Sequence, residues 1–285
     1  MFNRVPSFSQ HLFNYAPFAG AVAELWSGKS ISVDGVHGSA CALAVAAIRQ
    51  TGNRPILIIT AVTEQAEQIA DDLELFIPTA TNLIFPALEN LTSAGDSINE
   101  IKNNEIETNI FALADDLFGQ RIRVLKQLSG DSSSLTIVVA TILSLLQPVP
   151  SKELLAERTQ TLQVGKRVNP EQLRRFLVES GYHNTSAVDL PGEFAVRGSI
   201  FDLFAPDWEQ PVRVEFFDEE IESIRRFDLA TQRSLENRDK IDLTRILPNE
   251  TVEASLLDYL PPTSPIILVE PKEIELAAQH FRSLS

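Results

Sequence analysis

A glycine-containing turn near the start of the chain has the frame of a phosphate-binding loop. The apolar stretch Ile31–Val33 precedes Gly35 and Gly38, and an alanine-rich helix is predicted from about Cys41. A loop of the form G-x-x-x-x-G-K-[ST] uses its lysine on the outer phosphates and its hydroxyl on magnesium. Counted from Gly35, the second glycine, the lysine and the hydroxyl would fall on Ala40, Cys41 and Ala42. We therefore interpret this loop as vestigial, and we expect no cofactor and no catalytic residues.

The chain shows no pattern for metal or disulfide chemistry. Its one cysteine cannot form an internal disulfide and suits a reducing cytoplasm. The four histidines are scattered along the sequence, so we expect no metal site. Asp218-Glu219-Glu220 resembles the acids that handle magnesium in ATPases, but it lies between two predicted strands. A tight hairpin turn is therefore the better interpretation of these three acids.

Alternation along the predicted strand Pro211–Asp218 separates a core face from an outer face. Val212, Val214 and Phe216 share the core face, which leaves Arg213, Glu215 and Phe217 on the other. In the preceding predicted strand, Arg197 falls on the face opposite Phe194 and Val196. Arginine and aromatic residues are enriched in protein interfaces, so one hypothesis is a partner-binding face. The alternative is a surface arginine pair beside an incidentally covered phenylalanine.

The first half of the sequence has the strand–helix alternation of an α/β domain. Short apolar runs predict buried strands at Ile31–Val33, Pro55–Thr60, Asn82–Phe85 and Leu135–Thr141. Helices are predicted at Thr63–Phe76, whose apolar residues form one stripe, and at Asn103–Leu128, with an interruption near Gly119. This alternation favours an open parallel sheet with helices on both faces.

After Pro148–Ser151 the pattern changes to that of a small α+β domain. Asn169 and Pro170 have the residue types of an N-cap and a first helical position, and they predict a helix over Glu171–Ser180. Antiparallel strands are predicted at Glu193–Phe204, with Gly198 as a bulge, and at Pro211–Asp218, Ile221–Asp228 and Lys240–Leu247. The tail returns to a strand, Pro265–Val269, and a helix, Lys272–Ser283. We therefore predict domains at residues 1–150, 151–248 and 249–285.

The composition disfavours several functional classes. The chain has 285 residues, of which 44% are hydrophobic and 22% charged, as in ordinary globular proteins. Its longest apolar run, about Pro55 to Val62, is too short to span a bilayer, and the sequence start has no signal-peptide pattern. We therefore expect a cytoplasmic location and no membrane partner. The formal net charge of −15 repels DNA unless a local basic patch overrides it.

Two long motifs carry a resemblance to a known family. They are Gly192–Phe204 (GEFAVRGSIFDLF) and Pro211–Arg225 (PVRVEFFDEEIESIR), and Leu256–Pro262 also fits. In these residues the chain resembles the N-terminal part of the bacterial transcription-repair coupling factors (Mfd), a region similar to the UvrB excision-repair subunit. The resemblance covers most of the chain. It implies a degenerate P-loop, helicase-type domain (1–150, UvrB-like domain 1A), an inserted α+β domain (151–248, domain 2) and the start of domain 1B (249–285).

The resemblance also implies a partner and the residues that bind it. In the family, domain 2 binds UvrA, the damage-recognition ATPase, through residues that fall here on Arg197, Arg213 and Phe217. Arginine suits such a contact because its planar fork can pair with a carboxylate of the partner. The resemblance further implies that RNA polymerase and DNA are bound by C-terminal domains of the family protein, which we expect to lie outside these 285 residues. We therefore expect a non-catalytic adaptor that recruits UvrA to stalled RNA polymerase for transcription-coupled nucleotide excision repair.

A helicase-type fragment that binds ATP or DNA is the alternative function. In UvrB the loop keeps its lysine and threonine and binds ATP, whereas this chain retains only Gly-Val-His-Gly-Ser at Gly35–Ser39. Cys41 and Ala42 argue against ATP binding, and the net charge of −15 argues against DNA binding.

Overall fold

The computed structural model describes residues 8–88, 104–130, 135–245 and 254–284. The chain divides into two compact units, each of which is described here by itself. The first unit comprises Met1–Leu88, Val124–Val149 and Ala254–Ser285, and the second comprises Glu89–Arg123 and Pro150–Glu253. In the part of the chain that the structure describes, no helix is both long enough and apolar enough to cross a membrane.

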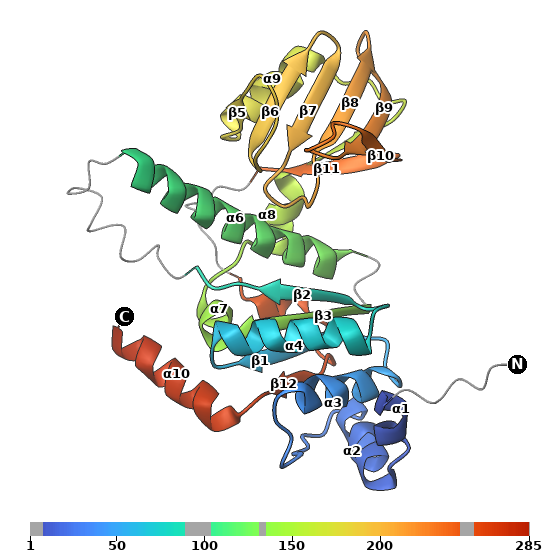
Figure 1. Ribbon diagram of the computed structural model, residues 1–285, viewed down its shortest axis with the longest axis vertical. Helices are drawn as coiled ribbons and strands as arrows, with labels where there is room; N and C mark the ends of the chain where they lie inside the picture. Colours follow the sequence, from blue (N-terminus) through green and yellow to red (C-terminus); the bar gives the residue numbers. More distant parts are fainter. Residues whose placement is uncertain (1–7, 89–103, 131–134, 246–253, 285) are drawn as a thin grey trace, which may run out of the picture. The chain divides into compact units, whose positions relative to one another are not determined.

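The first unit contains a parallel sheet with the strand order β12-β1-β3-β2 (Figure 1). The strands are β1 (Ile56–Thr60), β2 (Thr81–Phe85), β3 (Thr136–Thr141) and β12 (Ile266–Leu268). β1 and β3 are buried along their whole length, which explains why both read as continuous apolar runs in the sequence.

Helices α3 (Ser39–Arg49) and α4 (Thr63–Phe76) pack against this sheet. Val45 of α3 and Leu73 of α4 share a core with Ile58 and Val139 of the two central strands. The other helical segments of this unit are α1 (Phe8–Phe13), α2 (Ala16–Trp26), α7 (Ile142–Leu146), α10 (Pro271–Leu284) and a 3-10 helix at Leu256–Tyr259.

One predicted strand of this unit is wrong. Ile31–Val33 has no strand pairing and lies in a loop between Gly28 and Gly35, both of which have positive φ angles, of 89° and 77°. Val33 is exposed, so this stretch lacks the burial that stabilises a central strand. An apolar run of three residues does not show whether a neighbouring strand is available to pair with it.

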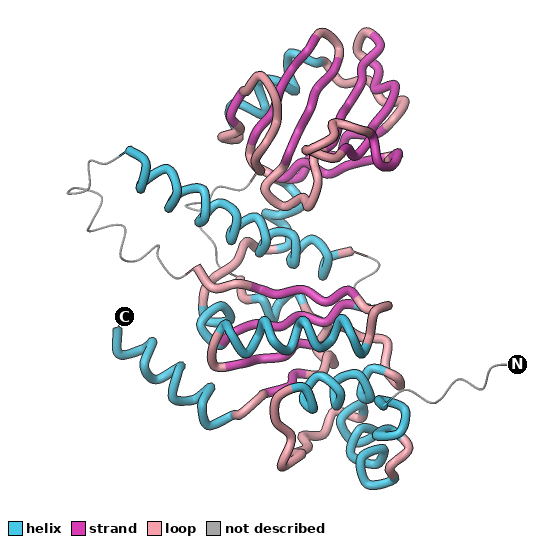
Figure 2. The backbone as a smooth tube through the Cα atoms, viewed as in Figure 1, coloured by secondary structure: helices cyan, strands magenta, loops and turns pink. Residues whose placement is uncertain are grey.

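The second unit contains a larger sheet with the strand order β10-β9-β8-β7-β6-β5. Neighbouring strands of this sheet appear side by side as magenta segments in Figure 2. Its strands are β5 (His183–Asn184), β6 (Glu193–Arg197), β7 (Ile200–Phe204), β8 (Val212–Phe217), β9 (Glu220–Phe227) and β10 (Ser234–Asn237). All neighbouring pairs are antiparallel except β5 and β6.

One face of this larger sheet packs on helix α9 (Pro170–Glu179) and on a separate two-stranded sheet of β4 (Thr159–Gln163) and β11 (Lys240–Thr244). Leu173 and Leu177 of α9 join Phe194, Phe201 and Val214 in this core. The short helix α8 (Lys152–Glu157) leads into β4. The predicted fold class, a parallel α/β domain with a small α+β domain, is confirmed.

Three local predictions in this unit need correction. Glu193–Phe204 is a hairpin rather than one strand, because Gly198 has a φ of 61° and forms the turn between β6 and β7 instead of a bulge. β11 pairs with β4, which the sequence pattern missed, and residues 246–247 of its predicted range lie outside the described residues.

The third correction concerns Gly119, which does not interrupt its helix. Helix α6 runs continuously over Asn104–Ser129. A Cβ atom built on Gly119 would lie 2.2 Å from the carbonyl oxygen of Pro206. The glycine therefore allows the helix and the Pro206 backbone to approach closely, which local sequence cannot reveal.

Candidate functional site

The strand register places Arg197, Arg213 and Phe217 on one face of the larger sheet, opposite the α9 core. Arg197 is paired with Ile200, which is paired in turn with Glu215 of β8. Arg213, Glu215 and Phe217 are alternate residues of β8, so their side chains leave the sheet on the same side. We call this side of β6–β9 the outer face.

Arg213 is already paired within the domain. Its Nε and Nη2 atoms donate to the two carboxylate oxygens of Asp202, at 2.6 and 2.8 Å. Its guanidinium carbon also lies 4.8 Å from the centroid of the Phe227 ring, in cation–π geometry. The hydrogen bond with Asp202 is the main cause that raises the pKa of Arg213. Asp202 therefore occupies the Nε–Nη2 side of the guanidinium, and a partner carboxylate would have to meet the remaining N–H groups of Nη1 and Nη2.

Arg197 lies at the end of β6, next to the Gly198 turn, and its side chain is exposed. Its Nη2 atom donates to the backbone carbonyl of Ser186 at 2.6 Å. This contact orients the guanidinium and uses only one of its five N–H donors. Arg197 is therefore the arginine of the outer face that can offer more of its hydrogen-bonding capacity to a partner.

Phe217 is the most exposed aromatic side chain of the outer face, with 75% of its surface accessible. It is the last residue of β8, immediately before Asp218, whose φ of 57° makes the hairpin turn to β9. Strand pairing and the turn therefore fix the backbone on both sides of Phe217, while the ring of Phe217 is exposed to solvent. Such an exposed aromatic residue on a rigid support is typical of an interface anchor.

Between Arg213 and Phe217 the outer face carries a second charge pair. Glu215 accepts a hydrogen bond from Ser223 Oγ at 2.8 Å and forms an ion pair with Arg225. The Ser223 hydrogen bond, followed by the contacts with Arg225, lowers the pKa of Glu215 below its ordinary value. Strand alternation had placed Glu215 on this face, whereas sequence reasoning missed Asp202 and Arg225 as parts of it.

The vestigial loop is placed at the start of α3, but its surroundings do not favour a phosphate. Gly35 and Gly38 both have positive φ angles, Ala40 is exposed and Ala42 is completely buried. The Cys41 thiol is half-buried and donates to the Val36 carbonyl at 3.7 Å. The positive φ angles of Gly35 and Gly38 thus give these two glycines a backbone role in the loop.

A carboxylate that sequence reasoning missed lies beside the vestigial loop. Glu270 follows β12 with a φ of 57°, and its Oε1 atom lies 3.5 Å from Nδ1 of His37. Its Oε2 atom accepts a hydrogen bond from Gln65 at 3.4 Å. Burial, and then the negative charge of Glu270, raise the pKa of the Cys41 thiol. A carboxylate held here would repel the phosphates of a nucleotide.

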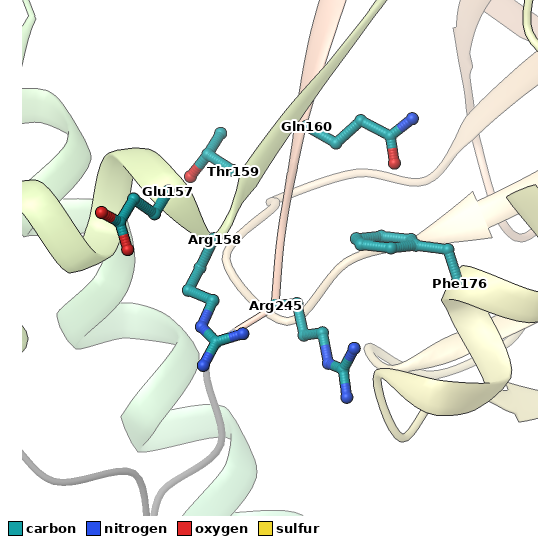
Figure 3. A pocket seen from close by; sticks show the side chains of 6 residues that line it. All are labelled: Glu157, Arg158, Thr159, Gln160, Phe176 and Arg245. Atoms are coloured by element: carbon teal, nitrogen blue, oxygen red, sulfur yellow. The ribbon is translucent and has the colours of Figure 1, made fainter.

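A small cavity of the second unit, with a volume of about 130 Å³, contains none of the predicted site residues. Figure 3 shows the side chains that line it, with the Phe176 ring and the guanidinium groups of Arg158 and Arg245 around the opening. The backbone N–H of Arg245 donates to the Arg158 carbonyl at 2.8 Å, which holds these two arginines side by side.

Comparison with known proteins first defines the class of the second unit. A family model described as the UvrB interaction domain matches residues 161–251, which include the outer face and all three predicted binding residues. Over these residues the second unit is therefore similar to the UvrB interaction domain.

Similar proteins then define the larger resemblance. The transcription-repair-coupling factor of Bacillus subtilis (strain 168) is 33% identical over 209 residues, covering 73% of this chain and 16% of the relative. The corresponding protein of Myxococcus xanthus is 29% identical over 227 residues, covering 80% of this chain and 18% of the relative. That of Staphylococcus aureus (strain USA300) is 34% identical over 213 residues, covering 74% and 17%. The chain is thus similar to the N-terminal UvrB-like module of transcription-repair coupling factors, and it spans less than a fifth of the length of these relatives.

Proposed function

We propose that this chain is a docking module that binds the UvrA protein through the outer face of its second unit. In this role it connects a transcription-repair coupling factor, at a stalled RNA polymerase, with nucleotide excision repair. The module itself performs no catalysis. The match to the UvrB interaction domain over residues 161–251 and the similarity to transcription-repair-coupling factors support this proposal.

The observation that carries the proposal is the exposure of Phe217 on the same face of the sheet as two arginines. A phenylalanine with 75% of its surface exposed contributes little to the packing of its own domain, yet it lies at the end of a strand that is paired up to the hairpin turn. Burial of such a side chain by a partner contributes roughly 1.5–3 kcal/mol, the range of an interface hot spot. Arg197 then supplies hydrogen-bond donors, and Arg213 supplies a fixed guanidinium edge whose position Asp202 determines.

The experiment that tests the proposal is calorimetric titration of purified UvrA with the wild-type chain and with Phe217→Ala. We expect Phe217→Ala to weaken UvrA binding by at least about tenfold while its melting temperature stays close to that of the wild type. Val178→Ala is the matched control, because Val178 is also an exposed apolar residue but lies on helix α9. Equal binding of UvrA by the wild type and Phe217→Ala would contradict the assignment of this face.

The second candidate function, an ATP- or DNA-binding fragment, is less well supported. The vestigial loop has neither lysine nor hydroxyl at Cys41 and Ala42, and Glu270 places a negative charge beside it. The net charge of −15 opposes DNA binding by this chain. We propose that contacts with RNA polymerase and DNA belong to other parts of the longer relatives, and that the protein acts in the cytoplasm.

The division into UvrB-like domains 1A (1–150), 2 (151–248) and the start of 1B (249–285) stays a prediction. Residues 246–253, where the last two domains would meet, lie outside the described residues.

A further inference from the structure

The hairpin that carries Phe217 is attached to the segment between β4 and α9. Gly165 donates its backbone N–H to the Ile221 carbonyl at 2.8 Å, and Val168 donates to the Glu219 carbonyl at 2.8 Å. In return, the Ile221 N–H donates to the Lys166 carbonyl at 3.0 Å. The start of β9 is therefore hydrogen-bonded on two sides, to β8 and to residues 165–168, which we call the bracing segment.

The side chain of Asn169, the residue that follows the bracing segment, forms hydrogen bonds with both the β8–β9 hairpin and helix α9. Its Oδ1 atom accepts the backbone N–H groups of Glu171 and Gln172, both at 3.1 Å, and so caps the N-terminus of α9. Its Nδ2 atom donates to Oε1 of Glu219 at 2.9 Å. The side-chain amide of Asn169 thus links the N-terminus of α9 to Glu219, the turn residue that follows Asp218.

Charged groups add to the same attachment. Nη2 of Arg167 lies 3.4 Å from Oδ2 of Asp218 and 3.4 Å from Oε2 of Glu219. Because these groups are largely exposed, their Coulomb attraction contributes little to stability. The contacts instead restrict the turn: Glu219 is bonded through its backbone carbonyl and through both carboxylate oxygens.

The consequence concerns Phe217, which lies two residues before Glu219. Strand ends beside exposed turns fray easily, and ordering a mobile side chain on binding costs affinity. A hairpin that is held in place before the partner arrives avoids much of this cost. We propose that Asn169 and Glu219 are positioning residues, which fix the β8–β9 turn so that Phe217 is presented to the partner in its binding conformation. This inference rests on the proposed function of the outer face.

The test uses a swap of donor and acceptor. Asn169→Asp keeps a side chain that caps helices well, but it replaces the N–H donor to Glu219 by a carboxylate. We expect this variant to bind UvrA about tenfold more weakly and to melt near the wild-type temperature. Glu219→Gln alone retains an acceptor for Asn169 and is expected to change UvrA binding by less than about threefold.

The double variant Asn169→Asp/Glu219→Gln restores the hydrogen bond with its direction reversed, because the glutamine amide now donates to the aspartate. We expect UvrA affinity to return to within about threefold of the wild type. The proposal is overturned if Asn169→Asp binds UvrA as well as the wild type, or if the double variant binds no better than Asn169→Asp. A purely structural role of Asn169 as helix cap predicts no such rescue.

Amide hydrogen exchange separates this inference from the proposed function. In the chain without UvrA, the Ile221 amide is expected to exchange at least about fivefold faster in Asn169→Asp and at the wild-type rate in the double variant. If the wild type fails to bind UvrA but the exchange rates follow this pattern, the proposed function is wrong and the attachment of the hairpin stands. Unchanged exchange in Asn169→Asp overturns the positioning role itself.

Discussion

Arg213 and Asp202 face each other across neighbouring strands β8 and β7 and form a bidentate pair, with N–O distances of 2.6 and 2.8 Å. Asp202 is almost completely buried, and the guanidinium group of Arg213 is the hydrogen-bonding partner of both its carboxylate oxygens. Arg213 therefore serves two purposes: it pairs with a buried acid, and it presents its remaining edge on the outer face.

The first prediction follows from this pair and concerns Arg213→Ala. Loss of the arginine leaves a buried, unpaired carboxylate, so we expect the free energy of unfolding to fall by about 3 kcal/mol. Urea unfolding monitored by circular dichroism measures this change. Substitutions at exposed positions usually change stability by less than about 0.5 kcal/mol, so Arg213 differs from Phe217 because of its buried partner Asp202. Reduced UvrA binding by Arg213→Ala must therefore be corrected for unfolding, whereas Phe217→Ala needs no such correction.

A companion change, Asp202→Asn, distinguishes the two purposes of Arg213. It removes the negative charge but keeps one oxygen acceptor for the guanidinium, so we expect a smaller loss, of about 1–2 kcal/mol. If Asp202→Asn lowered the free energy of unfolding as much as Arg213→Ala, the charge of the pair, and not its burial, would dominate its contribution to stability.

The second prediction is a pH dependence that involves Glu215. Its pKa in the folded protein is lower than its ordinary value of 4.5, chiefly because of the hydrogen bond from Ser223. The resulting stabilisation is fully present above pH 4.5 and is lost as the pH falls through the lower, folded-state pKa. We expect Glu215→Gln to be less stable than the wild type by about 1 kcal/mol at pH 7, with the difference vanishing in acid. Denaturant titrations at pH 7 and at successively lower pH measure the difference; a gap that does not narrow as the pH falls below 4.5 would contradict this origin.

The third prediction concerns Gly119 in helix α6. A Cβ atom at this position would lie 2.2 Å from the oxygen and 2.6 Å from the carbon of the Pro206 carbonyl, which are backbone atoms. We expect Gly119→Ala to lower the free energy of unfolding by about 1–3 kcal/mol, because the helix or the Pro206 segment must shift. Thermal unfolding is the measurement.

Gly20→Ala provides the matched control for this prediction. Gly20 also lies within a helix, α2, but nothing lies within 4 Å of the position its Cβ would take. We expect Gly20→Ala to stabilise the chain by about 0.5–1 kcal/mol, because alanine favours the helix. Similar effects of the two substitutions would mean that the close approach to Pro206 does not exist in solution.

The fourth prediction addresses the vestigial loop. The triple substitution Ala40→Gly, Cys41→Lys and Ala42→Thr restores the motif residues, yet we expect no measurable binding of Mg-ATP in calorimetry. A lysine at position 41 would lie close to Glu270, whose charge already affects the Cys41 thiol, and would pair with this carboxylate. Hydrolysis also requires acids and an arginine at fixed positions around the phosphates. Binding of Mg-ATP with micromolar affinity by the triple variant would contradict this view.

Much of the fold followed from local sequence. The helix predicted at Thr63–Phe76 agrees with α4 to the residue, and the N-cap predicted at Asn169 is confirmed by its hydrogen bonds to Glu171 and Gln172. These elements were predictable because a 3.6-residue period and a capping side chain act within a few residues of each other. Likewise, the period of two along β8 separated Val214 and Phe216 from Arg213 before any partner strand was known.

The site was predictable only in part, for a physical reason that the outer face illustrates. Alternation and residue type determined that Arg197, Arg213 and Phe217 share one side of a sheet, because side-chain direction along a strand is a local property. The N–H donors that Arg213 keeps for a partner depend on Asp202, which lies in another strand. The restriction of the turn after Phe217 depends on Asn169, which lies 48 positions before Phe217 in the sequence.

The sequence by itself therefore determined the kinds of elements, the face on which each strand residue lies and the absence of a lysine at Cys41. Only the tertiary structure decided that Ile31–Val33 is not a strand, that Glu270 lies beside the vestigial loop, and that Arg213 is paired within its own domain. Local preferences act through neighbouring residues, whereas ion pairs, close backbone contacts and strand register join residues that are distant in the chain and meet only when the whole domain packs.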